Sequence, residues 1–283
     1  VDPAYSALGE SATPEALEAY RNQHGLNDPF FIQYGRYLWN MLHGDLGTYG
    51  AGSSSVSDLV SKALPLTLQL TFLGLFIAVL ISFPLGVLAA LYRDRWPDQV
   101  IRVFSVIGIG TPSFWLAALL VLAFLHSPLK VSGEVPALTV NPTGWFLRML
   151  LPAIALAVPV IGQMTRVVRT SMVEELDRDY VRTAVGAGIP KSIVVARNVL
   201  RNALITPVTV LGLRVGYLMG GAVVIEIIFS INGMGKAVLL KGIQENWVTL
   251  VQGGALVVAI AFIIVNIIVD VLYLLINPRI RSV

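Results

Sequence analysis

Five long apolar stretches constrain the fold of this 283-residue chain more than any other feature. A bilayer core about 30 Å thick needs roughly 20 apolar residues in a helix to cross it. Stretches longer than this cover residues 63–91, 100–125, 145–168, 203–229 and 248–276. Only 13% of the residues are charged, against about 25% in a typical soluble domain. The sequence therefore predicts an all-α polytopic membrane protein with five spans.

The distribution of Lys and Arg predicts which side of the membrane each loop faces, because cytoplasmic loops carry an excess of basic residues. More than half of the 20 basic residues cluster around three places: the first connection, the third connection and the C-terminus. We therefore expect the 92–99 turn, the 170–202 loop and the C-terminus to be cytoplasmic, and residues 1–60 to lie on the opposite side. Export of residues 1–60 requires a preceding helix, so we also expect a sixth span upstream of Val1.

Residues 1–60 form the expected extracytoplasmic segment, in which two short helices are predicted. Thr13 caps the first helix, which starts at Pro14 and ends at Gly25. The second helix follows residues 28–29, and its broad apolar and aromatic face fits either the membrane interface or a packed extracytoplasmic cap. That face contains Phe30, Phe31, Tyr34, Tyr37, Leu38 and Met41. Residues 50–55, rich in Gly and Ser, are expected to be a flexible linker to the membrane domain, residues 61–283.

The longest cytoplasmic connection, residues 170–202, is predicted to form two helices, at 172–187 and 190–201. Gly188 suits the left-handed position that ends a helix, and Pro190 suits the start of the next one. An amphipathic helix of this kind either fills a groove in another protein or folds back on its own spans. The apolar stripe of the first helix contains Val173, Leu176, Tyr180 and Ala184.

This connection resembles the coupling loop of ABC importer permeases, and more narrowly that of the first permease in dipeptide and oligopeptide importers. The resemblance rests on Asp179-Tyr180-Val181-Arg182-Thr183-Ala184, Gly188 and Leu200-Arg201-Asn202-Ala203-Leu204. Further matches cover Gly44-Asp45-Leu46-Gly47, Leu64-Pro65-Leu66-Thr67-Leu68, Gly220-Gly221-Ala222-Val223-Val224-Ile225-Glu226, Phe229-Ser230 and Asn277-Pro278-Arg279-Ile280-Arg281. The general importer loop begins Glu-Ala-Ala, whereas Arg182-Thr183-Ala184 stands in those places here, and the late proline of the general motif is absent near Arg201.

The resemblance covers the whole chain and implies a type I ABC importer fold in the inner (plasma) membrane. It implies import of di- or oligopeptides by alternating access, with nickel or glutathione as the alternative cargo. The chain itself would not be an enzyme and would hold no cofactor, because ATP and Mg would bind to partner subunits. The implied partners are a homologous second permease in a heterodimer, two ATP-binding subunits and an extracytoplasmic peptide-binding protein, without nucleic acid.

Residue roles carried over from the resemblance concern the coupling loop and the outer end of the fourth span. The residues expected to couple to the ATPase are Glu175, Asp179, Tyr180, Val181, Arg182, Thr183, Ala184 and Gly188. The segment 229–247 is similar to the external gate of the family, and Gly233 and Gly235 would allow a tight turn there.

Within the spans, small and polar residues indicate packing and pathway roles. Gly212, Gly216 and Gly220 recur at four-residue steps and would let another helix approach closely. Arg214 is either a translocation-pathway residue for peptide carboxylates or half of an ion pair with another helix. Pathway roles are also open for Glu226, against an interfacial carboxylate in water, and for Asp270, against polar contact between helices together with Asn266. Kinks are expected at Pro84, Pro112, Pro152 and Pro159.

Several classes of site are excluded by the sequence. The chain contains no cysteine, so disulfides, thiolate catalysis and Cys-type zinc sites are ruled out. It contains neither an HExxH nor a GxSxG motif, and its three histidines are scattered. Residues 230–237 lack the leading glycine and the final Ser/Thr of a phosphate-binding loop. No catalytic residue is therefore expected.

Overall fold

The computed structural model describes residues 2–9, 12–50, 54–127, 129 and 131–276, except for the side chains of Ser6, Asp270 and residues 272–276. Residues 277–281, which carry the C-terminal part of the family resemblance, lie outside the described residues.

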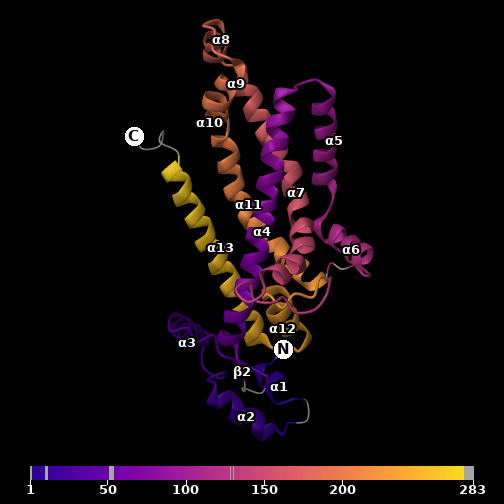
Figure 1. The fold of residues 1–283 in the computed structure, drawn as a ribbon. Helices are drawn as coiled ribbons and strands as arrows, with labels where there is room; N and C mark the ends of the chain where they lie inside the picture. The colour runs from indigo at the N-terminus through magenta and orange to yellow at the C-terminus, as the bar shows by residue number, and fades with distance from the viewer. Residues whose placement is uncertain (1, 10–11, 51–53, 128, 130, 277–283) are drawn as a thin grey trace.

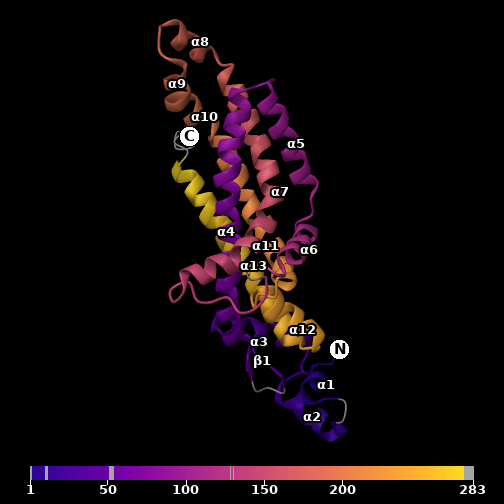
Figure 2. The same ribbon diagram turned by 45° about the vertical axis from the view of Figure 1, so that its right-hand side comes forward.

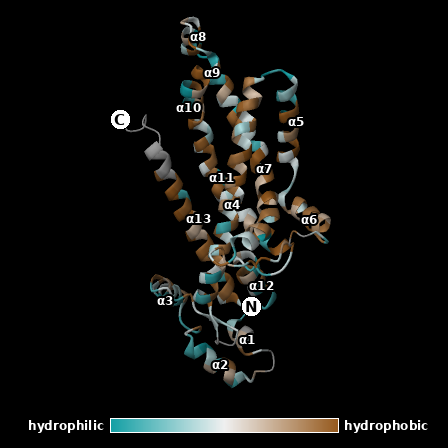
Figure 3. Ribbon diagram, viewed as in Figure 1, coloured by the Kyte–Doolittle hydropathy of each residue, from teal (hydrophilic) through white to brown (hydrophobic). Residues whose placement is uncertain are grey.

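Four long helices dominate the described chain: α4 (Val56–Leu91), α7 (Pro142–Leu176), α11 (Ile205–Ile228) and α13 (Val248–Ile276). Each is long and apolar enough to cross a bilayer. They form an elongated bundle (Figure 1), and their apolar composition is visible along its length (Figure 3). The most buried of the four is α7, which packs against α4, α5, α6 and α11. This arrangement confirms the expected all-α membrane fold.

The second expected span bends at Pro112, where a kink was expected, but the bend goes further than a kink and divides the span into two helices. Its residues form α5 (Trp96–Gly110) and α6 (Ser113–Phe124), which are bent by 97° relative to each other. Pro112 disfavours a helical conformation in the residue before it, and Thr111 is extended, with φ −89° and ψ 113°. The other prolines expected to kink a span lie inside the continuous helices α4 and α7. Figure 2 shows α6 turned away from the direction of α5.

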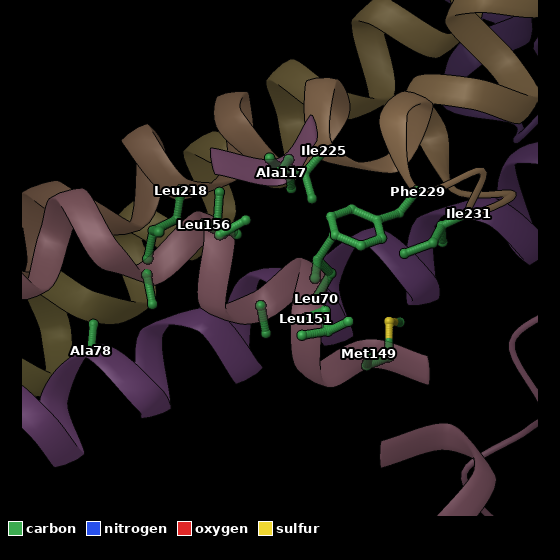
Figure 4. Close-up of a cluster of buried hydrophobic side chains, with 14 of the residues drawn as sticks. Leu70, Ala78, Ala117, Met149, Leu151, Leu156, Leu218, Ile225, Phe229 and Ile231 are labelled. Carbon is green, nitrogen blue, oxygen red and sulfur yellow. The ribbon is translucent and has the colours of Figure 1, made fainter. Parts of the chain in front are cut away.

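Glycines allow α7 to approach its neighbours closely at two crossings. A Cβ atom on Gly162 would lie 2.4 Å from the carbonyl oxygen of Ser105 in α5. A Cβ atom on Gly86 of α4 would lie 2.6 Å from the Cβ of Val168. Any larger side chain at these crossings would push the helices apart. The space between α4, α6, α7 and α11 is filled by apolar side chains, among them Leu156, Leu218, Ile225 and Phe229 (Figure 4).

The extracytoplasmic segment contains α1 (Pro3–Leu8), α2 (Pro14–Gln23) and α3 (Phe30–Leu42). The Oγ1 atom of Thr13 accepts the backbone N–H of Ala16, and Gly25 has φ +63°, so the predicted cap and stop of α2 are confirmed. The strands β1 (Thr48–Tyr49) and β2 (Ser54–Ser55) pair antiparallel, so the last two residues of the expected flexible linker form a strand; residues 51–53 of the linker lie outside the described residues. Helix α4 starts at Val56 and so runs through the domain boundary expected at residue 60.

The loop over residues 170–202 differs from its expected layout in two respects. Instead of a continuous helix over 172–187, α7 runs to Leu176, and α8 (Asp179–Gly186) starts after a break at residues 177–178. The second part contains α9 (Lys191–Val194), the π-helix η1 (Val195–Val199) and α10 (Leu200–Ala203), where one helix was expected. This loop and the turn between α4 and α5 lie at one end of the bundle, and α1–α3 lie at the other (Figure 1).

At the outer end, the chain folds back after α11 through the π-helix η2 (Met234–Leu240) and α12 (Lys241–Gln244). Both elements belong to residues 229–247, the segment that resembles an external gate in sequence. Their apolar side chains join the first turns of α4 and α13 in a second buried cluster, which includes Val56, Val60, Met234, Val238 and Leu250.

Candidate functional site

The cytoplasmic tip, defined here as residues 179–194, presents an exposed surface at one end of the bundle (Figure 1). All residues from 185 to 193 are exposed, as are Arg182 and Thr183. The distance between Oδ1 of Asp179 and Nη1 of Arg182 is 4.0 Å, and both side chains are exposed to solvent. Gly188 has φ +87°, a conformation that favours glycine and turns the chain from α8 into α9.

The apolar stripe of the loop faces the chain itself. Val173, Leu176, Tyr180 and Ala184 pack against a buried cluster at the cytoplasmic end. Val181, expected to face a partner, belongs to that cluster and is only 5% exposed. Of the two alternatives for the stripe, the structure agrees with the helix folded back on this chain, where α8 packs against α9. The surface open to a partner therefore lies on the opposite side, with Arg182, Thr183 and residues 185–193.

Glu175, near the end of α7, connects that helix to the tip through hydrogen bonds. Its Oε1 atom accepts hydrogen bonds from the Tyr180 hydroxyl at 2.9 Å and from Nδ2 of Asn202 at 3.2 Å. Burial raises the pKa of Tyr180, and the hydrogen bond to Glu175 raises it further. Tyr180 of α8 and Asn202 of α10 therefore both bind the Glu175 carboxylate of α7, which joins the three helices. Glu175, expected to couple to the ATPase, is placed so that it fixes the orientation of the tip.

An ion-pair cluster, which the sequence analysis missed, ties α5 to α7 near the tip. Asp98 is fully buried, and its carboxylate accepts hydrogen bonds from Nε and Nη2 of Arg169, both at 2.6 Å. Arg102 donates to the same carboxylate at 3.1 Å, and the N–H of Asp94 donates at 3.0 Å. The paired geometry of Arg169 is the strong form of an arginine–carboxylate contact. An acidic residue inside an arginine-rich turn was the available sequence signal.

The outer turn, residues 229–235, is held by groups from three helices. Oε2 of Glu226 accepts the N–H of Gly235 at 2.7 Å, and Oγ1 of Thr67 accepts the N–H of Met234 at 2.9 Å. Arg148, which is 1% exposed, donates from Nη2 to the carbonyl of Phe229 and from Nε to the carbonyl of Gly133. Arg148 and Thr67 were not expected to have this role. An arginine inside the third apolar stretch was the sequence signal for the first of them.

Glu226 itself does not lie in water at the cavity mouth, as the sequence analysis allowed. Its side chain is fully buried, because the turn folds back over the end of α11. A Cβ atom on Gly233 would lie 2.3 Å from Oε1 of Glu226, so only glycine fits beside this carboxylate. Oε1 has no hydrogen-bond partner among the described residues.

Arg214 and the glycine series lie on α11. The Arg214 side chain is half-buried, its Nε atom has no hydrogen-bond partner in the described part of the chain, and no carboxylate of that part pairs with it. A Cβ on Gly212 would lie 2.5 Å from Val269, and one on Gly216 would lie 2.0 Å from Phe262. Both glycines therefore face α13, whereas Gly220 faces open space. The side chain of Asp270 lies outside the described residues.

An open cavity of about 520 Å³ lies beside the outer turn. Its walls come from α4, η2 and α12, and Lys62, Lys236 and Lys241 contribute to its lining. The outer end therefore offers positive charge, and the cytoplasmic end offers the exposed tip.

Comparison with known proteins gives consistent matches in sequence. Residues 82–282 match a family described as the binding-protein-dependent transport system inner membrane component. The chain is 38% identical to a protein of Brucella abortus (strain 2308) named as a peptide transport system permease, covering 99% of this chain and 89% of the relative. It is 38% identical to the D,D-dipeptide transport system permease DdpB of Escherichia coli (strain K12), covering 99% and 88%. It is 37% identical to the glutathione transport system permease GsiC of Salmonella paratyphi A, covering 99% and 89%.

Two solved structures share the fold at low sequence identity. An inward-facing form of the methionine ABC transporter MetNI superposes with a TM-score of 0.61 and 16% identity, covering 77% of this chain and 96% of that chain. An amino acid ABC transporter determined with histidines superposes with a TM-score of 0.57 and 15% identity, covering 79% and 94%.

Proposed function

We propose a peptide-import function for this chain, which belongs to the family of binding-protein-dependent transport system inner membrane components. It is a multi-pass inner-membrane permease of an ABC importer, with the type I importer fold. This confirms the family and the fold expected from the sequence. The proposal adds the cargo, the composition of the transporter and the way in which ATP hydrolysis reaches the membrane spans.

The single observation that carries the mechanism is the exposed cytoplasmic tip. Residues 185–193 project from the end of the bundle, while the opposite face of α8 is packed on α9 and η1. A motor protein that moved this surface would move α7 with it, because Glu175 and the buried cluster join them, and would move α11 through α10, which leads into it. We infer that an ATP-binding subunit docks on this surface, and that its closure switches the access of a central cavity. ATP and Mg would bind to that subunit.

The complete transporter would contain a second, homologous permease, two ATP-binding subunits and an extracytoplasmic binding protein. The apolar surfaces of α11 and α13 that remain exposed, including Leu213, Tyr217 and Ile263, leave room for a second permease or lipid beside this chain. The binding protein would deliver cargo at the outer end, where the lysine-lined cavity lies.

Small peptides are the proposed cargo because two of the reported relatives carry peptide or dipeptide transport names. Glutathione, itself a tripeptide, is the second candidate, since a relative of nearly equal identity carries that name. Arg214 is the proposed contact for the cargo carboxylate, because its guanidinium has no acidic partner among the described residues. On this proposal, Arg214→Ala slows uptake of peptides with a free C-terminus more than uptake of amidated peptides.

The test is ATP-dependent uptake of a labelled di- or tripeptide by cells that carry or lack this gene, with redundant peptide importers deleted. Ala187→Glu, on the exposed part of the tip, should reduce uptake at least tenfold while leaving the amount of protein in the membrane unchanged. Gln99→Glu, an exposed change at the same end but outside the tip, is the matched control and should transport normally. Normal uptake by Ala187→Glu would contradict the docking role, and gene-independent peptide uptake would contradict the cargo.

A further inference from the structure

Helix α3 has its apolar side turned away from the protein. Phe31 is 84% exposed, Leu42 75% and Trp39 64%, and Phe30, Ile32 and Tyr34 are also exposed. At about 100° per residue, these side chains fall on one broad arc of the helix. None of the 13 residues of α3 is buried. In a water-soluble helix the apolar arc would face the core, so this arrangement is inverted.

The narrower inner arc of α3 is the more polar one. Gln33 lies on it and donates from Nε2 to the carbonyls of Leu26 at 2.9 Å and Asp28 at 2.7 Å. Asn40 shares this side and is partly covered. The only charged residue of the helix, Arg36, is paired with Asp28 at 2.6 Å. The outer arc therefore presents aromatic and aliphatic groups with almost no charge.

Helix α3 lies beside the outer ends of two spans (Figure 1). Met41 packs against the buried outer cluster that contains Val56 and Val60, in the first turns of α4, and Leu250, in the first turn of α13. Figure 1 shows α3 beside the outer ends of these two spans. At 1.5 Å per residue, its 13 residues measure about 20 Å, which is too short to cross the bilayer. Trp and Tyr are enriched at this depth because their rings are apolar and their tips are polar.

We propose that α3 lies in the outer interface of the inner membrane, with its aromatic arc in contact with lipid. A lipid surface fits better than a protein groove because the arc is broad, almost uncharged and lies beside the outer ends of two spans. The contact anchors the extracytoplasmic segment beside α4 and α13. The proposal rests only on the membrane location of the chain and is independent of its cargo.

The absence of cysteine makes the chain suitable for site-directed spin labelling. Single variants Phe31→Cys and Trp39→Cys report on the outer arc, Asn40→Cys on the inner arc, and Glu15→Cys on the exposed surface of α2. Each labelled permease is assembled with cysteine-free partner subunits in nanodiscs of phosphatidylethanolamine and phosphatidylglycerol. Collision rates of the nitroxide with oxygen and with a water-soluble nickel chelate are then measured.

Contact with lipid gives higher oxygen than nickel accessibility at positions 31 and 39, the reverse at position 15, and low accessibility to both at position 40. Nickel accessibility at positions 31 and 39 equal to that at position 15 would place the arc in water and overturn the proposal. Low accessibility to both reagents at positions 31 and 39 would show a protein occupant and also overturn it.

Discussion

At the scale of single residues, the Asp98–Arg169 pair is the contact whose loss has the most direct energetic consequence. Asp98 is fully buried, and its removal by Asp98→Ala leaves Arg169, whose side chain is 22% exposed, without its main partner. Breaking a buried pair in this way typically costs about 3–5 kcal/mol. We therefore expect a marked loss of thermal stability in lipid nanodiscs, measured as the unfolding temperature.

The matched control for this pair is Asp177→Asn. Asp177 accepts Arg93 at 2.9 Å, but both side chains are about half-exposed or more. Exposed pairs contribute about 0–1 kcal/mol, so this variant should remain close to wild type. An equal loss of stability in the two variants would show that burial of Asp98 is not what makes the contact strong.

Glu226 offers a second residue-scale prediction, concerned with local order. Glu226→Ala removes the acceptor for the buried N–H of Gly235, and an unsatisfied buried donor costs about 1–3 kcal/mol. Glu226→Gln keeps a side-chain carbonyl at the same distance from the main chain. We expect faster hydrogen exchange at residues 231–236 in Glu226→Ala than in Glu226→Gln, measured by mass spectrometry. Similar exchange in both variants would mean that Thr67 and Arg148 hold the outer turn without this carboxylate.

At the scale of elements, the packing of α11 on α13 depends on Gly212 and Gly216, which face α13, whereas Gly220 does not. Gly216→Val places side-chain atoms where Phe262 lies, since even a Cβ would be 2.0 Å away. Gly220→Val meets nothing within 4 Å of its Cβ in the described chain. We expect Gly216→Val to destabilise the permease by about 1–3 kcal/mol through overpacking. The unfolding temperature of the isolated permease in nanodiscs measures this difference.

The comparison between Gly216 and Gly220 also separates internal from external packing. If Gly220→Val is harmless in the isolated permease but prevents copurification with partner subunits, the open side of Gly220 receives another protein. Equal destabilisation by both substitutions in the isolated permease would contradict the assignment of α13 as the neighbour of Gly212 and Gly216.

Sequence reasoning predicted the long helices because span length and hydropathy are local properties of the chain. It could not tell a proline that breaks a helix from one that is accommodated. Pro152 and Pro159 stay inside α7 and Pro84 stays inside α4, whereas α5 ends before Pro112, although Pro84 and Pro112 are both exposed. The break at residues 177–178, which separates α7 from α8, contains no proline and was also missed.

The candidate site was predictable only where it depends on neighbours in sequence. The tip residues were found from a local motif. The sequence could not show that Val181 is buried while Arg182 and Thr183 are exposed, because this depends on how α8 packs against the following helices. Asp98 and Arg169 are 71 residues apart, and Arg148 and Phe229 are 81 apart, so their contacts follow from the packing of α7. Glu226 was misplaced because the fold-back of the turn over α11 is a tertiary feature.

At the scale of the whole molecule, we expect the chain to cross the membrane between α4 and α7. Helix α4 ends at the cytoplasmic end of the bundle, and α7 starts near the outer end (Figures 1 and 2). The connection between them contains the bent pair α5–α6, although the 15 residues of α5 measure only about 22 Å. On this expectation, α5 and α6 together make the crossing for which the sequence predicted one helix with a kink at Pro112.

Labelling of single cysteines from outside tests this topology. Glu15→Cys, Gln244→Cys and His126→Cys should react with a membrane-impermeant maleimide in spheroplasts, because all three positions are exposed and lie on the outer side of the predicted crossings. Gln99→Cys and Ala187→Cys should react only after the membrane is opened with detergent. Protection of His126 together with Gln99 would place both ends of the α5–α6 pair in the cytoplasm, make the pair a re-entrant loop, and contradict the five-span topology of this chain.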